Sequence, residues 1–410
     1  MPALLYATSL LLILMSTPVA AAGEEALLFE RISARLGLMK AVAADKWLGD
    51  RPIEDLQREA DVLHKSAYAG LRVGITIDSN NRFYQAQISA AKSIQHYWFN
   101  HWREHSGPDK GDSLVEVIRP KLISLGESIA TLLKNPVAEA QRQLFLAKTT
   151  IEGLDRQHQE AIFDRLLALQ YYPDRLTQIR DSGMLRVGTT GDYAPFSESR
   201  VAGQYNGIDI DLIHDLANTL EVEVVLVATS WPSLLSDLSN NAFDIAMSGI
   251  SRTLQRQQHG FLSKPYHTGG KTPIIRCSDQ ARIKSLSDID QKGVRIIVNP
   301  GGTNERYVDA HIKLAEKVLF ADNRTIFEEI VQGRADVMIT DAIEVTLQTN
   351  RQQGLCPAMP GKTLTYQEKA ILLQQDPILL NYVNLWLDLR LADGTVQRTF
   401  ANHLQANQQP

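Results

Sequence analysis

Phe-Asp-Ile-Ala-Met-Ser-Gly-Ile-Ser, residues 243–251, is the stretch that decides the fold of the larger part of this 410-residue chain. The apolar run 245–247 is typical of a buried parallel strand. The small polar turn 248–251 follows at the carboxyl end of that strand, where open α/β sheets bind ligands. Arg256 comes next on helix-compatible sequence and could clamp a carboxylate through two hydrogen bonds. The alternative is an ordinary turn with a solvated arginine.

Strand-like and helix-like segments alternate on both sides of this stretch, which predicts a parallel α/β sheet. We expect strands at 185–189, 222–228, 243–247, 294–298 and 337–340, and helices at 208–220, 231–238, 303–315, 325–331, 377–391 and 395–404. Asp-Ile-Ala-Met at 244–247 is echoed by Asp-Val-Met-Ile at 336–339, and a small polar turn follows each. The echo indicates two similar lobes, with residues 265–270 as a flexible crossing between them.

Residues 24–172 have a different period, since apolar residues recur there every three or four positions. They predict an all-α domain of roughly 150 residues, a normal domain size. Residues 73–77 are its single β-like run.

The first 22 residues are typical of a secretory signal peptide, with an apolar run at 3–15 and small residues at 19–22. No other stretch is apolar enough to span a membrane, so we expect no stable membrane insertion after cleavage. The net charge of −5 and the lack of a basic run argue against a nucleic-acid partner. The expected domains are 1–22 (signal peptide), 23–172 (all-α) and 173–410, with one lobe at about 173–268 and 366–410 and the other at about 269–365.

Cys277 and Cys356 are the two cysteines of the sequence. In an exported protein, two cysteines suggest one disulfide. No histidine lies at ligand spacing from either cysteine, so no metal site is expected.

The helical part carries cationic groups at suggestive spacings. Arg35 and Lys46 are eleven residues apart, close to three helical turns, so both are expected on one helix face. The polar residues that follow on later helices are Asp55, Arg58, Glu59, Gln95 and Arg119. Together they would hold a small polyanion, although each one alone could be a solvated helix charge.

These spacings resemble the exported AroQ-type chorismate mutases over about residues 28–132. The motifs are Arg35-x10-Lys46-Trp, Pro-Ile-Glu-Asp55-x2-Arg58-Glu59, Gln-Ile-x6-Gln95 and Ile-Arg119-Pro. The resemblance implies an all-helical fold with the site within one chain. It implies that Arg35, Arg58 and Arg119 bind the carboxylates of chorismate, that Lys46 and Gln95 donate to the ether oxygen, and that Glu59 takes the ring hydroxyl, with Asp55 also at the substrate. The rearrangement to prephenate needs no nucleophile, only a held conformer and stabilisation of charge on the breaking ether.

The α/β part opens with Arg-Val-Gly-Thr-Thr-Gly-Asp-Tyr-Ala-Pro-Phe at 186–196, which looks like the start of a two-lobed periplasmic amino-acid-binding protein. Such proteins bind a carboxylate with an arginine at the position of Arg256. Asn-Pro-Gly-Gly-Thr-Asn at 299–304 presents backbone N–H groups at a helix start, where anions are favoured.

The match is closer to cyclohexadienyl dehydratase, an enzyme built on that fold. The motif residues are Asp192, Trp231, Ser248, Lys271, Asn299, Thr303, Asp341 and Glu344. The resemblance implies loss of water and carbon dioxide from prephenate, with arogenate also accepted. Glu344 would be the general acid, which requires a raised pKa, and Lys271 and Asn299 would hold the substrate. Without the resemblance, the sequence predicts that Glu344 is an exposed glutamate on a helix. Aromatisation drives the reaction, so no cofactor is expected.

The two resemblances predict an all-α chorismate mutase domain followed by a two-lobed periplasmic-binding-protein-like domain. We therefore expect an exported, periplasmic, bifunctional enzyme that converts chorismate to prephenate and prephenate to phenylpyruvate. One alternative is a mutase fused to a non-catalytic solute receptor, because receptors use an aspartate at the position of Asp341 to hold an amino group. In another, the helical domain is a dimerisation module, and a homodimer is left open.

Overall fold

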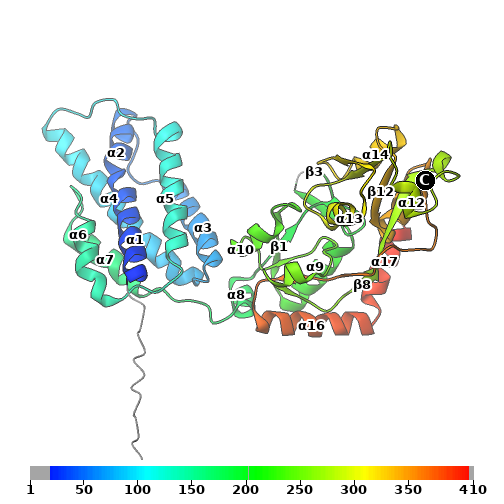
Figure 1. Ribbon diagram of the computed structural model, residues 1–410. Helices are drawn as coiled ribbons and strands as arrows, with labels where there is room; N and C mark the ends of the chain where they lie inside the picture. Colours follow the sequence, from blue (N-terminus) through cyan, green and yellow to red (C-terminus); the bar gives the residue numbers. More distant parts are fainter. Residues whose placement is uncertain (1–18, 202, 406–410) are drawn as a thin grey trace, which may run out of the picture. The chain divides into compact units, whose positions relative to one another are not determined.

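The computed structural model describes residues 19–201 and 203–405, and it contains two compact units (Figure 1). The first unit ends at Tyr171 and the second begins at Tyr172. Most of the predicted signal peptide, residues 1–18, lies outside the described residues. None of the described helices is long and apolar enough to cross a membrane.

The first unit is helical, as predicted. Its helices are α1 (Val19–Gly37), α2 (Met39–Leu48), α3 (Leu56–Arg72), α4 (Ile77–Glu104), α5 (Arg119–Leu132), α6 (Arg142–Lys148) and α7 (Arg156–Leu167), with a π-helical turn at Leu114–Ile118 and a 3-10 turn at Glu139–Gln141. Its core is apolar and includes three phenylalanines, Phe29, Phe145 and Phe163, whose rings pack with centroids 5.2–6.3 Å apart.

Two details of the helical unit differ from the sequence prediction. Arg35 and Lys46 do not share one helix, because the chain turns at Leu38 between α1 and α2. The β-like run at 73–77 supplies a single bridge, from Ile75 to Tyr171, and its last residue already begins α4. Because only Ile75 of this run pairs with Tyr171, the run forms an isolated bridge and not a strand.

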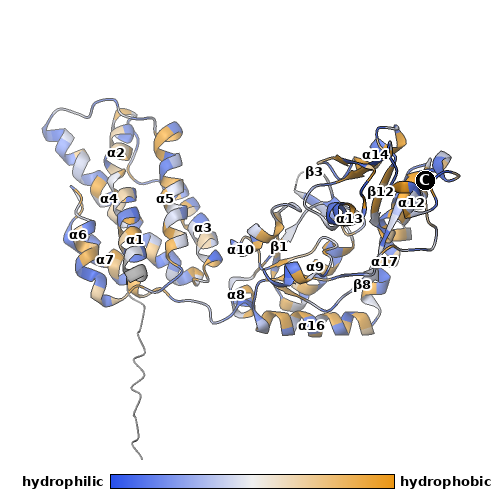
Figure 2. Cartoon of the chain, viewed as in Figure 1, coloured by the Kyte–Doolittle hydropathy of each residue, from blue (hydrophilic) through white to orange (hydrophobic). Residues whose placement is uncertain are grey.

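The second unit contains two five-stranded sheets. The first has the order β5-β1-β6-β15-β7, from β5 (Glu223–Ala228), β1 (Met184–Thr189), β6 (Ile245–Ala246), β15 (Leu372–Leu373) and β7 (Phe261–Leu262). The second has the order β11-β10-β12-β9-β13, from β11 (Glu316–Leu319), β10 (Arg295–Val298), β12 (Val337–Asp341), β9 (Lys271–Arg276) and β13 (Leu355–Pro357). A small three-stranded sheet, β2 (Asp192–Tyr193), β3 (Ser197–Val201) and β4 (Gln204–Asn206), follows β1. Strand β12 is buried along its length, and Figure 2 colours most of it apolar.

The helices of this unit follow the predicted alternation. They are α8 (Arg175–Ser182), α9 (Ile208–Leu220), α10 (Leu234–Ser239), α11 (Leu254–Gln257), α12 (Leu286–Ile289), α13 (Thr303–His311), α14 (Ile326–Val331), α15 (Ala342–Arg351), α16 (Pro377–Ala392) and α17 (Thr395–Gln405). Helix α9 has the predicted bounds, whereas α13 ends four residues early because the chain turns into strand β11, which the sequence reading missed.

The all-parallel prediction is wrong at one side of each sheet. Strands β5, β1 and β6 pair in parallel, as do β11, β10 and β12, but β15 and β9 join antiparallel. The reason lies in the connections between lobes. The chain leaves the first sheet through β8 (His267–Gly269) and returns through β14 (Gln367–Lys369), and these two short strands pair with each other. The expected crossing at 265–270 therefore has a second strand beside it.

The echo at Asp244 and Asp336 marks equivalent positions in the two lobes. Asp244 accepts hydrogen bonds from the backbone N–H of Arg186, at 2.9 Å, and from its guanidinium. Asp336 accepts the same pair of bonds from Arg295, the backbone one also at 2.9 Å. Each carboxylate thus locks the strand on which its arginine lies, and the two lobes share one local design.

Cys277 and Cys356 form the predicted disulfide, with their Cα atoms 4.8 Å apart. Their separation of 79 residues closes a long loop, for which the chain-entropy model gives up to about 4–5 kcal/mol of stabilisation. A C277S/C356S variant should therefore unfold at lower urea concentration than the parent. Denaturant midpoints and a thiol titration of the unreduced, unfolded parent check this. Two free thiols in the parent, or unchanged midpoints, would contradict it.

Two candidate functional sites

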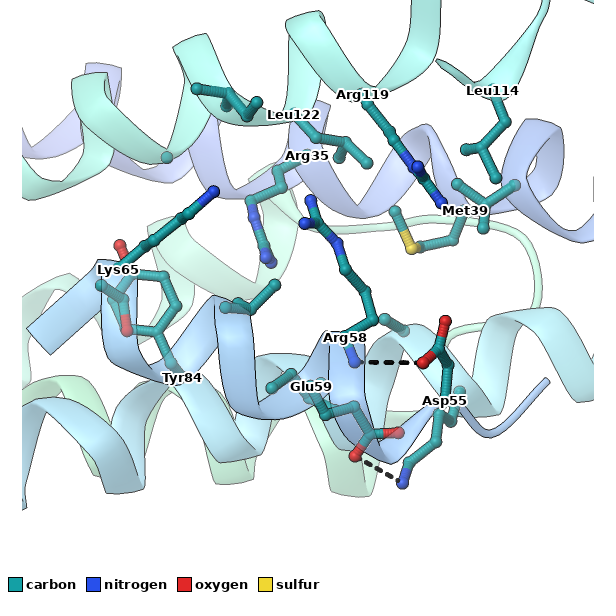
Figure 3. A pocket seen from close by; sticks show the side chains of 18 of the residues that line it. Arg35, Met39, Asp55, Arg58, Glu59, Lys65, Tyr84, Leu114, Arg119 and Leu122 are labelled. Carbon is teal, nitrogen blue, oxygen red and sulfur yellow. Dashed lines mark hydrogen bonds and ion pairs between the residues drawn. The ribbon is translucent and has the colours of Figure 1, made fainter.

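A cavity of about 400 Å³ lies in the helical unit, and we call it the helical-domain cavity (Figure 3). All seven residues predicted for this part of the chain line it: Arg35, Lys46, Asp55, Arg58, Glu59, Gln95 and Arg119. They come from five helices, α1 to α5, or from the residue that caps one of them. Figure 3 shows Arg35 and Arg119 reaching down and Arg58 reaching up into the space between the helices.

Burial removes hydration from the cations of this cavity, which favours the binding of an anionic ligand. It lowers the pKa values of Arg35 and Lys46, because taking a charge out of water disfavours the charged form. Arg35 donates to Gln87 at 3.3 Å, and Lys46 donates to the carbonyl oxygen of Ile53 at 2.5 Å. An anionic ligand between these groups would restore the stabilisation that water supplies elsewhere.

The carboxylates in the cavity have defined partners. Asp55 caps α3 and accepts a hydrogen bond from the backbone N–H of Arg58 at 3.0 Å, which fixes the first turn that carries Arg58. Glu59, in that same turn, pairs with Lys92 of α4 at 3.1 Å. Sequence reasoning did not single out Lys92, which also lines the cavity. Its position three residues before Gln95, on the same helix face, could have indicated it.

Gln95 is buried in the wall of this cavity. Its amide nitrogen donates to the carbonyl oxygen of Ala91 at 3.0 Å and lies 4.0 Å from the sulfur of Met39, which is a weak acceptor. Its amide oxygen has no hydrogen-bond partner among the described residues. A buried amide with unused capacity is costly unless a ligand completes it, so Gln95 is a candidate contact for a polar ligand atom.

The second site is a cleft between the two lobes of the second unit, which we call the interlobe cleft. Its lining residues are Tyr193, Trp231, Gly249, Ser251, Arg256, Asn299, Gly302, Thr303, Asn304, Asn323, Asp341 and Lys369. Its free volume is about 20 Å³, close to that of one water molecule. The lobes are therefore closed in this structure and must part to admit an organic substrate.

Five of the nine predicted residues of this unit line the cleft: Trp231, Arg256, Asn299, Thr303 and Asp341. Asp192 accepts a hydrogen bond from the indole of Trp231 at 3.1 Å and so lies behind it. Ser248 is buried against Thr190, whose hydroxyl is 2.8 Å away. Lys271 and Glu344 also lie behind the lining, as described next.

Asp341 is the centre of the cleft wall. Its carboxylate contacts Lys369 and the hydroxyl of Tyr193 through one oxygen and lies 3.5 Å from Lys271 through the other. The residue is 4% exposed. Burial alone would raise its pKa, but the charges of Lys369 and Lys271 outweigh burial and hold the pKa below the usual range. Asp341 is therefore an anion whose charge is already compensated.

A chain of hydrogen bonds joins Glu344 to the cleft. Glu344 contacts the hydroxyl of Thr340, which accepts a bond from Asn304 at 3.0 Å. Asn304 contacts Lys271, which donates to Thr303 at 3.1 Å. Burial raises the pKa of Glu344 to about 8 and lowers that of Lys271 to about 8. Glu344 can thus hold a proton at neutral pH, which fits a general acid.

The other cation of the cleft is Arg256. It is buried beside Trp231, with its guanidinium carbon 5.8 Å from the ring centre, and donates to the carbonyl oxygen of Ser251 at 2.7 Å. Burial lowers its pKa to about 10. The bond to Ser251 ties the arginine to the turn that the sequence predicted as the ligand site.

Sequence reasoning missed Lys369, Tyr193 and Asn304. Lys369 lies on β14, a three-residue strand without periodicity, and its contacts with Asp341 and Ser251 are distant in sequence. Tyr193 and Asn304 stood inside the quoted motifs, directly beside Asp192 and Thr303, so the motifs themselves carried a signal for them. The described residues contain no group of three His, Cys, Asp or Glu side chains that could hold a metal ion.

Comparison with known proteins matches residues 185–406 to the bacterial extracellular solute-binding proteins, family 3. Cyclohexadienyl dehydratase of Pseudomonas aeruginosa is 46% identical over 238 residues, which cover 58% of this chain and 89% of that protein. The L-cystine-binding protein of Escherichia coli K12 is 26% identical over 226 residues, covering 54% of this chain and 83% of the relative.

Among solved structures, the ancestral amino acid-binding protein AncCDT-1, described as a precursor of cyclohexadienyl dehydratase, superposes with a TM-score of 0.53. It is 34% identical and covers 56% of this chain and 99% of its own. An enzyme and amino-acid-binding proteins therefore both resemble this chain.

The raised pKa of Glu344 makes folding stability depend on pH. The native state keeps a proton on Glu344 up to about pH 8, whereas the unfolded chain releases it near pH 4.5, so native stability falls as pH rises between these values. Each pKa unit corresponds to about 1.4 kcal/mol. E344Q cannot release a proton, and its free energy of unfolding should therefore gain a few kcal/mol on the parent between pH 5 and pH 8.

Urea unfolding of parent and E344Q at several pH values measures this difference. Asp209, whose pKa burial raises to about 7, contributes equally to both proteins and cancels. Parallel stability curves for the two proteins would show that Glu344 is ionised in the native state at neutral pH.

Proposed function

The chain belongs to the bacterial extracellular solute-binding proteins of family 3, and on that basis we propose that its second unit is a cyclohexadienyl dehydratase. The observation that carries the proposal is Glu344, which is buried, holds a proton at neutral pH and is joined by hydrogen bonds to the cleft wall. It lies in a chain that is 46% identical to such an enzyme over 238 residues. A binding protein needs no proton donor behind its ligand site.

The proposed reaction turns prephenate into phenylpyruvate, carbon dioxide and water. The bond from the ring to its carboxylate breaks and releases carbon dioxide, and that electron pair aromatises the ring and expels the ring hydroxyl. Hydroxide leaves poorly, so Glu344 protonates the departing oxygen, which leaves as water. Asn299 holds the substrate and Arg256 binds a carboxylate, while Lys271, which lies behind the lining, positions Thr303 through its hydrogen bond of 3.1 Å. No cofactor is required, because aromatisation supplies the driving force.

For the first unit we propose chorismate mutase activity. The convergence of all seven motif residues on one cavity supports it, since the motif spacing alone did not require them to meet. Chorismate is a dianion, and the cavity offers Arg35, Arg58 and Arg119 to its carboxylates. Lys46 and Gln95 would stabilise the charge that develops on the ether oxygen. The product of this unit is then the substrate of the next.

The protein would act outside the cytoplasm, in the periplasm, in line with the extracellular family to which it belongs. The competing function is a mutase fused to an amino-acid receptor, and the likeness to AncCDT-1 favours it. Incubation with prephenate decides between the two. The dehydratase releases phenylpyruvate with one equivalent of carbon dioxide, whereas a receptor returns prephenate unchanged.

Replacing Gln95 by glutamate should shift the mutase reaction to lower pH. A carboxylate at this buried position repels the charge developing on the ether oxygen unless it is protonated, so kcat/KM for chorismate should fall by about tenfold or more above the pKa of the new carboxyl group. The pH profile of prephenate formation measures this shift. It is recorded with both proteins also carrying E344Q, so that the dehydration step does not consume the prephenate. An unshifted profile would remove Gln95 from the ether oxygen.

Glu344→Gln should abolish dehydration and spare the mutase. Glutamine fills nearly the same volume and can keep the bond to Thr340, but it cannot release a proton, and general acid catalysis typically contributes ~10²–10⁴-fold. The variant supplied with chorismate should accumulate prephenate. Parental rates of phenylpyruvate formation would exclude Glu344 as the acid, and T346A, on the exposed side of the same helix, is the matched control.

A further inference from the structure

Asn323 lines the interlobe cleft and has no role in the dehydratase mechanism proposed above. It lies in the turn between β11 of the second sheet and α14, and it is 4% exposed. Its neighbours in the turn, Asp322 and Arg324, pair with each other at 2.9 Å, and Arg324 is exposed. The turn therefore directs its amide side chain inward, whereas its two charged side chains pair nearer the surface.

One hydrogen bond across the cleft fixes the orientation of the Asn323 amide. Its nitrogen donates to the backbone carbonyl oxygen of Asp192 at 2.9 Å, and Asp192 begins β2, which follows β1 of the first sheet. A carbonyl oxygen can only accept, so the nitrogen must face it and the amide oxygen is turned away. Because the bond joins the two lobes, the amide takes up this position as the cleft closes.

The amide oxygen of Asn323 is buried and has no hydrogen-bond donor among the described residues. A buried acceptor without a donor is costly, so this oxygen has capacity for a ligand. Asp341 differs in this respect, because Lys369 and Tyr193 already contact its carboxylate. Asn299 also has an unpartnered amide oxygen in the cleft, but no hydrogen bond among the described residues fixes which way its amide faces.

The chemistry of the two substrates narrows down the donor. At neutral pH the carboxylates and the 2-oxo group of prephenate can only accept hydrogen bonds, so the ring hydroxyl is its one donor. Arogenate has the same hydroxyl and an ammonio group besides. The hydroxyl is therefore the donor that both acids share, and a site that accepts both can bind it without distinguishing between them.

Asn323 also lies near the acid of the proposed reaction. Burial is the main cause of the raised pKa of Glu344, and the negative charge of Asp192 adds to it, so these two carboxyl groups are close enough to interact. The backbone of that same Asp192 holds the Asn323 amide. A hydroxyl bound by Asn323 would thus lie in the same part of the cleft as its proton donor.

We propose that the amide oxygen of Asn323 accepts a hydrogen bond from the ring hydroxyl of the substrate, a contact that rests on the proposed dehydratase function. The bond directs the hydroxyl proton toward Asn323 and leaves a lone pair of the same oxygen for the proton of Glu344. When the bond from carbon to oxygen breaks, the departing water carries both protons, its own and the one received from Glu344. Asn323 exchanges no proton and orients the leaving group.

The first test compares N323L with the parent on the full chain. Leucine fills nearly the same volume as asparagine but offers neither an acceptor nor a donor. The value of kcat/KM should fall by about tenfold for prephenate and by the same factor for arogenate, because the buried hydroxyl then lacks its acceptor. The ratio of the two values should therefore stay close to that of the parent.

A binding measurement separates this contact from the bond that Asn323 makes to Asp192. The acids 4-hydroxyphenylpyruvate and phenylpyruvate differ only by the hydroxyl, and calorimetry gives both Kd values without turnover. Loss of the bond to Asp192 weakens both acids equally, whereas loss of the acceptor weakens the hydroxylated acid alone. The preference of the parent for the hydroxylated acid should fall by about tenfold in N323L.

R324K is the matched control, since Arg324 is the exposed neighbour in the same turn and lysine keeps its charge, and both measurements should equal those of the parent. Circular dichroism checks folding, and N323A, for which the same pattern is expected, serves if N323L unfolds. Equal losses for the two phenylpyruvates, a loss of kcat/KM confined to arogenate, or parental values in the folded variant would each overturn the proposal.

The proposed function and the role of Asn323 fail separately. A parent that turns over neither prephenate nor arogenate refutes the dehydratase, and the two phenylpyruvates then decide alone whether Asn323 binds a hydroxyl. An active parent whose hydroxyl preference is unchanged in N323L refutes the role of Asn323 and leaves the dehydratase standing.

Discussion

The buried carboxylate of Asp341 and its two lysines are the interaction on which the second unit depends. Asp341 ends β12, Lys271 begins β9 directly after the outgoing crossing strand, and Lys369 ends the returning one. One anion therefore ties the two connections between the lobes to the sheet of the second lobe. Tyr193 of the first lobe donates to the same carboxylate, so the closed cleft and the charge pairing are a single arrangement. Buried ion pairs rarely add net stability, but they impose geometry.

That arrangement sets the chemistry of the groups around it. Burial away from water, and after it the negative charge of Asp341 one helical turn away, raises the pKa of Glu344, whereas the two lysines keep the pKa of Asp341 low. Two carboxyl groups three residues apart thus have opposite protonation at neutral pH. This separation of roles, one structural anion and one proton donor, follows from where each side chain finds a cation.

The sequence predicted the helical first unit, helix α9 with its bounds, the disulfide and the raised pKa of Glu344, because each depends on local period, cysteine count or family motif. It did not predict β11, β14 or Lys369. Strands of three or four residues have too few positions to show a period, and their place is set by pairing with residues far along the chain. The motif also could not distinguish residues that line the cleft, such as Thr303, from those behind it, such as Lys271.

The central claim is that one chain carries out two consecutive reactions, and the most direct test gives it chorismate alone. Nuclear magnetic resonance of the reaction mixture distinguishes chorismate, prephenate and phenylpyruvate. The account predicts that the full chain consumes chorismate and forms phenylpyruvate, with prephenate as the intermediate. Chorismate that remains unchanged would contradict the function proposed for the helical-domain cavity, and prephenate that accumulates without phenylpyruvate would contradict the one proposed for the interlobe cleft.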